Sequence, residues 1–91
     1  MNEKNLLNPN DVITQAVHHH QKNNFKLAEK LYKQILKSNP NHLDAIFYLG
    51  SLSVQIKNFE QGKNLLEKLI KAQPNHATGN TNLGIVYVEL G

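Results

Sequence analysis

The sequence predicts an all-α fold built from repeated pairs of antiparallel helices, and three observations support that prediction. The tripeptide Pro-Asn-His at 40–42 recurs at 74–76, an offset of 34 residues. The same offset relates Leu-Gly at 49–50 to Leu-Gly at 83–84. Within each period the apolar residues follow the spacing of an amphipathic helix, as at 28, 31, 32, 35 and 36.

Each period holds two helices. The pattern predicts first helices over 10–22, 42–56 and 76–90, and second helices over 25–38 and 59–72. Asn residues at 23, 24 and 58 tolerate the left-handed backbone that reverses direction between paired helices. Pro40 and Pro74 end the second helices, and Asn41 or Asn75 could then cap the next helix. His42 and His76, at the same corners, are expected to pack or cap.

Composition limits the function. The chain has 91 residues, enough for one small domain and too few for a separate enzyme domain. All 10 basic residues are Lys, and the net charge of +3 could favour acidic partners. Because Arg is absent and the aromatic residues stand at core spacing, nucleic-acid binding is not expected.

The compartment is inferred from what the sequence lacks. It has no Cys, residues 1–5 contain no apolar run typical of a signal peptide, and the longest apolar stretch, 45–49, is too short for a bilayer. We therefore expect no membrane insertion and a cytoplasmic protein, with residues 1–8 as a flexible N-terminal arm.

The spaced signature Leu83-Gly84-x-x-Tyr87, together with Ala28-x-x-x-Tyr32 and the two prolines, resembles the tetratricopeptide repeat family. The resemblance implies a short right-handed solenoid of about two and a half repeats and five helices. Repeat 1 would span 9–42, repeat 2 would span 43–76, and 77–91 would be the first helix of a third, truncated repeat. Small residues, namely Ala16, Gly50, Gly84, Ala28 and Gly62, would let paired helices approach closely.

The resemblance also implies a concave groove lined by the first helices, which would bind a peptide or protein segment. Gln21 and Asp44 fall on this surface, and the proposed partner-binding residues are Ile13, Val17, His20, Phe47, Tyr48, Ser51, Val54, Thr78 and Asn82. An alternative is that some of these side chains pack against the N-terminal arm or further repeats. If the groove binds a peptide or protein segment, the chain would act as a scaffold or targeting segment.

A second hypothesis makes this chain the substrate-presenting repeat region of a longer enzyme, such as a glycosyltransferase. Asn82 resembles the groove asparagine of the repeats that precede O-linked N-acetylglucosamine transferases. Carboxylate-clamp chemistry is absent, because Ile13, Val17 and Tyr48 replace the cationic residues that it needs.

No catalytic set, cofactor motif or metal site is predicted. Three consecutive histidines, 18–20, point about 100° apart on a helix and cannot all bind one metal ion. His19 is expected to be half-buried and its two neighbours solvated.

Two surface features remain. Lys26, Lys30, Lys33 and Lys37 form a stripe that is expected to face solvent, and Glu29–Lys33 and Glu67–Lys71 are helix-supporting pairs. Residues 83–90 carry apolar side chains around more of the helix than one contact can bury, which predicts self-association or marginal stability.

Overall fold

The computed structural model describes residues 9–91 and contains five α-helices within that range. They are α2 (Pro9–Gln21), α3 (Phe25–Ser38), α4 (Leu43–Gln55), α5 (Phe59–Ala72) and α6 (Ala77–Leu90). Each agrees with the predicted range to within one residue at either end. The arm predicted for residues 1–8 lies outside the described residues.

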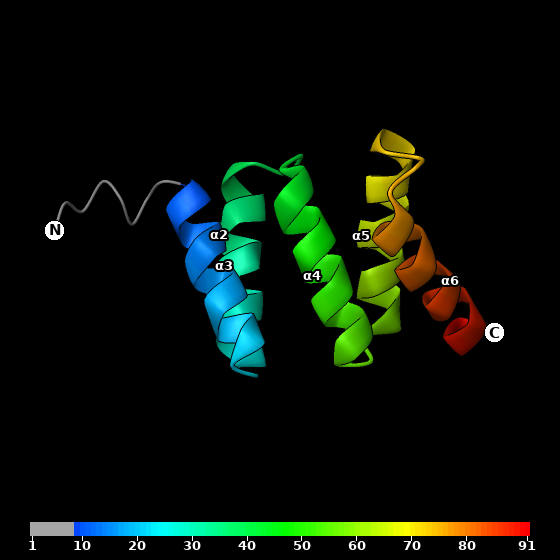
Figure 1. Ribbon diagram of the computed structural model, residues 1–91, viewed down its shortest axis with the longest axis horizontal. Helices are drawn as coiled ribbons and strands as arrows, with labels where there is room; N and C mark the ends of the chain where they lie inside the picture. The colour runs from blue at the N-terminus through cyan, green and yellow to red at the C-terminus, as the bar shows by residue number, and fades with distance from the viewer. Residues whose placement is uncertain (1–8) are drawn as a thin grey trace, which may run out of the picture.

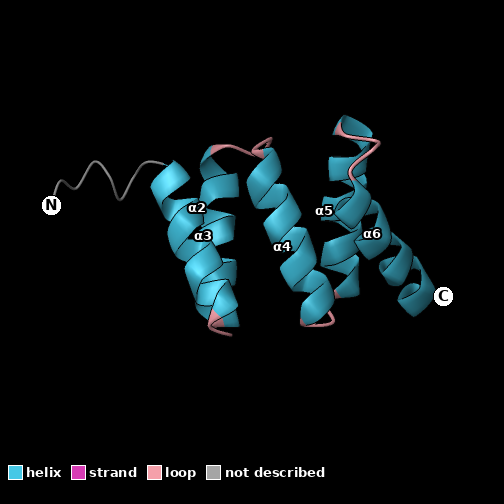
Figure 2. Cartoon of the chain, viewed as in Figure 1, coloured by secondary structure: helices cyan, strands magenta, loops and turns pink. Residues whose placement is uncertain are grey.

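The helices follow one another in chain order from one side of the molecule to the other (Figure 1). Helix α2 packs against α3, α4 against α5, and α3 and α5 each pack against the helix that follows them. The first helices also touch one another, α2 with α4 and α4 with α6. All the described secondary structure is helical, joined by short loops (Figure 2). This is the predicted all-α stack of antiparallel helix pairs.

The helix pairs turn through residues with positive φ. Asn23, between α2 and α3, has φ 64°, as the sequence indicated. Between α4 and α5 the prediction was wrong, because Lys57 rather than Asn58 has the positive φ, 66°. Asn58 instead caps α5, with its Oδ1 accepting from the Gln61 amide at 3.4 Å.

Histidine, not asparagine, caps the helices that begin new repeats. His42 Nδ1 accepts from the Ala45 amide at 3.2 Å, and His76 Nδ1 accepts from the Gly79 amide at 2.9 Å. The suggestion of Asn41 or Asn75 as cap is therefore wrong. The imidazole of the residue directly before each helix reaches the same amide that a shorter capping side chain would reach.

Two main clusters of buried side chains form the core. The first joins α2, α3 and α4 through Ala16, Ala28, Tyr32, Leu49 and Leu52. The second joins α4, α5 and α6 through Ile46, Leu66, Leu69, Leu83 and Val86. Since each cluster draws on three consecutive helices, α4 contributes to both and connects the two repeats.

Polar contacts also link the repeats. The hydroxyl of Ser53, which is fully buried, donates to the Leu49 carbonyl at 2.6 Å. Gln61 Nε2 on α5 donates both to Ser53 Oγ, at 2.8 Å, and to Glu29 Oε2 on α3, at 3.0 Å. The predicted Glu29–Lys33 pair is present at 3.4 Å, so Glu29 serves two partners.

Close helix approach occurs at only some of the small residues. A Cβ on Gly50 would lie 2.9 Å from Leu66 Cδ2, which confirms the predicted close approach at Gly50. A Cβ on Gly62 would make ordinary van der Waals contacts, the nearest at 3.5 Å. For Gly84 the prediction was wrong, because nothing lies within 4 Å of a Cβ there. Gly79 was missed: its Cβ would lie 2.8 Å from Leu69 Cδ2.

Candidate functional site

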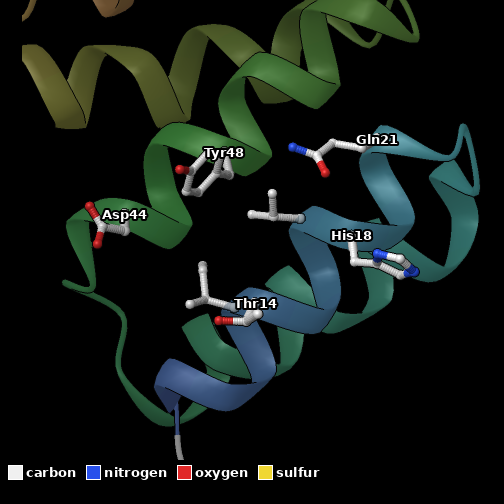
Figure 3. A pocket seen from close by; sticks show the side chains of 7 residues that line it. Thr14, His18, Gln21, Asp44 and Tyr48 are labelled. Carbon is white, nitrogen blue, oxygen red and sulfur yellow. The ribbon is translucent and has the colours of Figure 1, made fainter.

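An open hollow of about 410 Å³ lies between the first helices α2 and α4. We call it the α2/α4 hollow. The residues that line it are Ile13, Thr14, Val17, His18, Gln21, Asp44 and Tyr48. Figure 3 shows Asp44 and Tyr48 on one wall, with Thr14, His18 and Gln21 on α2 opposite them. Because these residues come from different repeats, the hollow depends on the stacking of the two units.

The lining combines an apolar base with polar groups at the edge. Ile13, Val17 and Tyr48 are partly buried and pack against the first core cluster. Thr14, His18, Gln21 and Asp44 are exposed. The Thr14 hydroxyl donates to the Asn10 carbonyl of its own helix at 2.9 Å. Such a surface can bury an apolar side chain while offering hydrogen-bond groups to a ligand.

The wall that carries Tyr48 is held by aromatic packing. The Tyr48 ring stacks on Tyr32, with centroids 5.9 Å apart and an interplanar angle of 9°. Tyr32 is fully buried, and burial, with the neighbouring Tyr48 acting in the same direction, raises the pKa of Tyr32 to about 12. The Tyr32 hydroxyl therefore stays protonated and available as a donor.

His20 lies at the end of α2, outside the hollow, and connects three helices. Its Nε2 donates to Gln55 Oε1 on α4 at 2.7 Å, and its Nδ1 accepts from the Tyr32 hydroxyl on α3 at 3.1 Å. The expectation that His20 is solvated was wrong, because its ring is partly buried and contacts the rings of Phe25 and Tyr32. His19 is half-buried, as expected, and His18 is exposed.

A sequence model described as the tetratricopeptide repeat matches residues 19–81. This chain belongs to the tetratricopeptide repeat family. The match covers the end of α2, all of α3, α4 and α5, and the beginning of α6.

Solved structures agree with this assignment. MamA 41-end from Desulfovibrio magneticus RS-1 superposes with a TM-score of 0.86 at 26% identity, covering 93% of this chain and 47% of that one. The MamA RS-1 ArsTM double mutant gives 0.84 at 24% identity, covering 88% and 45%. This chain thus spans less than half of either solved chain. No curated protein sequence matches it.

The tetratricopeptide fold distributes the predicted groove residues over several environments. Ile13, Val17 and Tyr48 meet in the α2/α4 hollow. Ser51 and Asn82 meet further along, where Asn82 Nδ2 donates to Ser51 Oγ at 3.0 Å. These two side chains therefore tie α4 to α6.

The remaining predicted groove residues lie towards the second repeat's core or in solvent. Phe47 packs against the second core cluster, with its ring 4.7 Å from that of His76. Val54 packs against the same cluster, and Thr78 is exposed. Phe47 and Val54 thus contribute to packing as well as to the predicted surface.

Two residues of the hollow, Thr14 and His18, were absent from the predicted groove. Thr14 stands 34 positions before Tyr48, so the repeat register could have placed both on the same face. His18 stands 34 positions before the buried Leu52 and reads as a core position. It is exposed in the structure, as expected for the solvated neighbours of His19.

Residues 9–91 contain no group of three or more His, Cys, Asp or Glu side chains that could hold a metal ion. Nor is any helix in this range long and apolar enough to span a bilayer. Lys26, Lys30, Lys33 and Lys37 are all exposed along α3, as the stripe predicted.

Proposed function

We propose that this chain is a cytoplasmic protein-interaction module that binds a peptide or protein segment along α2, α4 and α6, as part of a scaffold or targeting protein. Membership of the tetratricopeptide repeat family supports an interaction scaffold. The observation that supports the binding face is the α2/α4 hollow, in which apolar Ile13 and Val17 lie beside exposed polar groups. No catalytic role is proposed for these residues.

The binding surface in this proposal comprises the hollow and its continuation towards α6. It includes Ile13, Val17, His20, Phe47, Tyr48, Ser51, Val54, Thr78 and Asn82. Within that surface the hollow would take an anchoring side chain, while the more distant Asn82 and Thr78 would contact the backbone of a bound segment.

A selection of random dodecapeptides on the immobilised chain tests this proposal. Gln21→Trp places a large side chain at the edge of the hollow, and Gln34→Trp makes the same change on exposed α3. We expect peptides selected on the unmodified chain to bind Gln34→Trp equally and Gln21→Trp at least about tenfold more weakly, since steric exclusion removes the anchor contact. Peptides that bind all three proteins alike would contradict the use of the hollow.

We also propose that α6 mediates self-association. Ile85, Tyr87, Val88 and Leu90 are 44%, 47%, 77% and 41% exposed, and Glu89 is the one charged side chain on this helix. Exposed apolar groups on a nearly uncharged helix favour burial against another surface.

The alternative hypothesis makes this chain the substrate-presenting region of a longer enzyme, and it predicts a catalytic domain downstream. Sequencing the gene beyond the codon for Gly91 would test it.

A further inference from the structure

Charge is divided between the two sets of helices. The first helices α2, α4 and α6 carry Asp11, Asp44 and Glu89 and no lysine. The second helices α3 and α5 carry most of the lysines, at 26, 30, 33, 37, 63, 68 and 71. The net charge of +3 therefore does not describe the surface that lines the α2/α4 hollow.

When His18 is neutral, Asp44 is the only charged residue among those that line the hollow. It is exposed, and no ion pair involves it among residues 9–91. Tyr48 follows one turn later on α4, and Figure 3 shows both side chains on the same wall. A carboxylate beside an aromatic ring and a phenolic oxygen is well suited to a cation, and it repels an anion.

The opposite wall adds the second half of the recognition surface. Ile13 and Val17 on α2 offer aliphatic contact beside Asp44, and the Gln21 amide offers a further acceptor. A lysine or arginine can lay its carbon stem on apolar surface while its charged end reaches a carboxylate. An aliphatic residue next to it in a ligand would then reach Ile13 and Val17.

We infer that the α2/α4 hollow recognises a basic peptide segment, with a Lys or Arg at Asp44 and a neighbouring aliphatic residue at Ile13 and Val17. This inference rests on the proposed function and specifies its partner. It reverses the expectation from net charge that acidic partners are favoured. Physiological salt screens charges over about 8 Å, and the hollow is lined by Asp44 and by no lysine, so its carboxylate is the charge that a bound segment meets there.

The dodecapeptide selection also tests this inference, through the amino-acid sequences of the selected peptides. On the unmodified chain we expect enrichment of Lys or Arg adjacent to Leu, Ile or Val. Asp44→Asn should weaken binding of those peptides about tenfold, the usual effect of losing one charge-assisted hydrogen bond. Asp44→Lys should shift the selection to Asp and Glu.

Glu60→Gln is the matched control, because Glu60 is also an exposed carboxylate in the first turn of its helix, on α5 outside the hollow. It should leave both affinity and selected sequences unchanged. Circular dichroism shows whether each variant folds. If Asp44→Lys does not fold, binding by Asp44→Asn alone tests the inference.

Each other outcome has a distinct meaning. Peptides that are blocked by Gln21→Trp but lack basic residues would overturn this inference and leave the proposed function standing. Basic peptides whose binding survives Asp44→Asn and Asp44→Lys would place the recognition elsewhere and overturn it too. If no peptide distinguishes the unmodified chain from Gln21→Trp, the proposed function itself fails.

Discussion

The backbone of Gly50 lies against Leu66 so closely that a Cβ on Gly50 would stand 2.9 Å from Leu66 Cδ2 and 3.0 Å from its Cγ. Leu66 is fully buried in the second core cluster and has little room to move. Gly84 occupies the same place in α6, one repeat later, and meets nothing within 4 Å. The two glycines are thus equivalent in sequence and different in environment.

Gly50→Leu should lower the free energy of unfolding by about 1–3 kcal/mol, the usual cost of overpacking a core. Gly84→Leu is the matched control and should not destabilise the chain, because Leu favours a helix more than Gly by about 0.8 kcal/mol. Urea denaturation at low protein concentration measures both. A Gly50→Leu loss below about 1 kcal/mol would show that α4 and α5 can separate without penalty.

The histidine caps lead to a second prediction. His42→Ala should cost about 1 kcal/mol of unfolding free energy, because the Ala45 amide loses its side-chain acceptor. Asn41→Ala, one residue earlier and exposed, should change stability by less than about 0.5 kcal/mol. Thermal and urea unfolding of the two variants would measure the difference, and equal effects would contradict the assignment of the cap to His42.

Stability should fall at high pH through Tyr32. Its pKa in the folded chain is about 12, above the ordinary 10.0, so the folded state keeps this proton after the unfolded chain has released it. The stability that this pKa difference contributes is complete below pH 10 and is lost as the pH rises from 10 to 12. The loss reaches about 1 kcal/mol of unfolding free energy by pH 11.

Tyr32→Phe removes this titration together with the hydrogen bond to His20. The stability difference between the two chains should therefore shrink between pH 9 and 11, as followed by urea unfolding at each pH. A difference that stays constant over this range would mean that Tyr32 ionises equally easily in both states.

Self-association through α6 should depend on its exposed apolar side chains. Leu90→Glu should weaken any concentration-dependent association by about tenfold or more, since a buried charge replaces apolar contact. Leu27→Glu is the control on α3, because Leu27 and Leu90 are both 41% exposed. Sedimentation and thermal unfolding over a wide concentration range measure the effect. A monomer with a high, concentration-independent melting temperature would rule out this role for α6.

The helix positions were predictable because the repeat register and the apolar spacing agree. The backbone conformation of individual residues was less predictable. Lys57 and Asn58 compete for the turn, and the chain uses Asn58 as a cap, which leaves the positive φ to Lys57. The environment of Gly84 also lay beyond the pattern, because its sequence equivalence to Gly50 says nothing about which helix covers it.

The candidate site was predictable only in part for a similar reason. Periodicity placed Ile13, Val17 and Tyr48 on one face, and the structure brings them together. It could not show that His20 turns towards Tyr32 and Gln55, since that depends on a hydrogen-bond geometry spanning three helices. Nor did net charge reveal that α2, α4 and α6 carry no lysine, and the predicted helix over 10–22 would have included Lys22.

Gln61 has a consequence for how the molecule opens. Its amide group holds Glu29 in the first helix pair and Ser53 in the second. Separating α3 from α5 breaks the bond to Glu29, and separating α4 from α5 leaves the fully buried Ser53 hydroxyl without one of its partners. Partial opening of one pair alone is therefore disfavoured. Backbone amides near the middle of α3 and α5 should exchange with solvent through a shared event, and fraying should be confined to the outer ends of the stack.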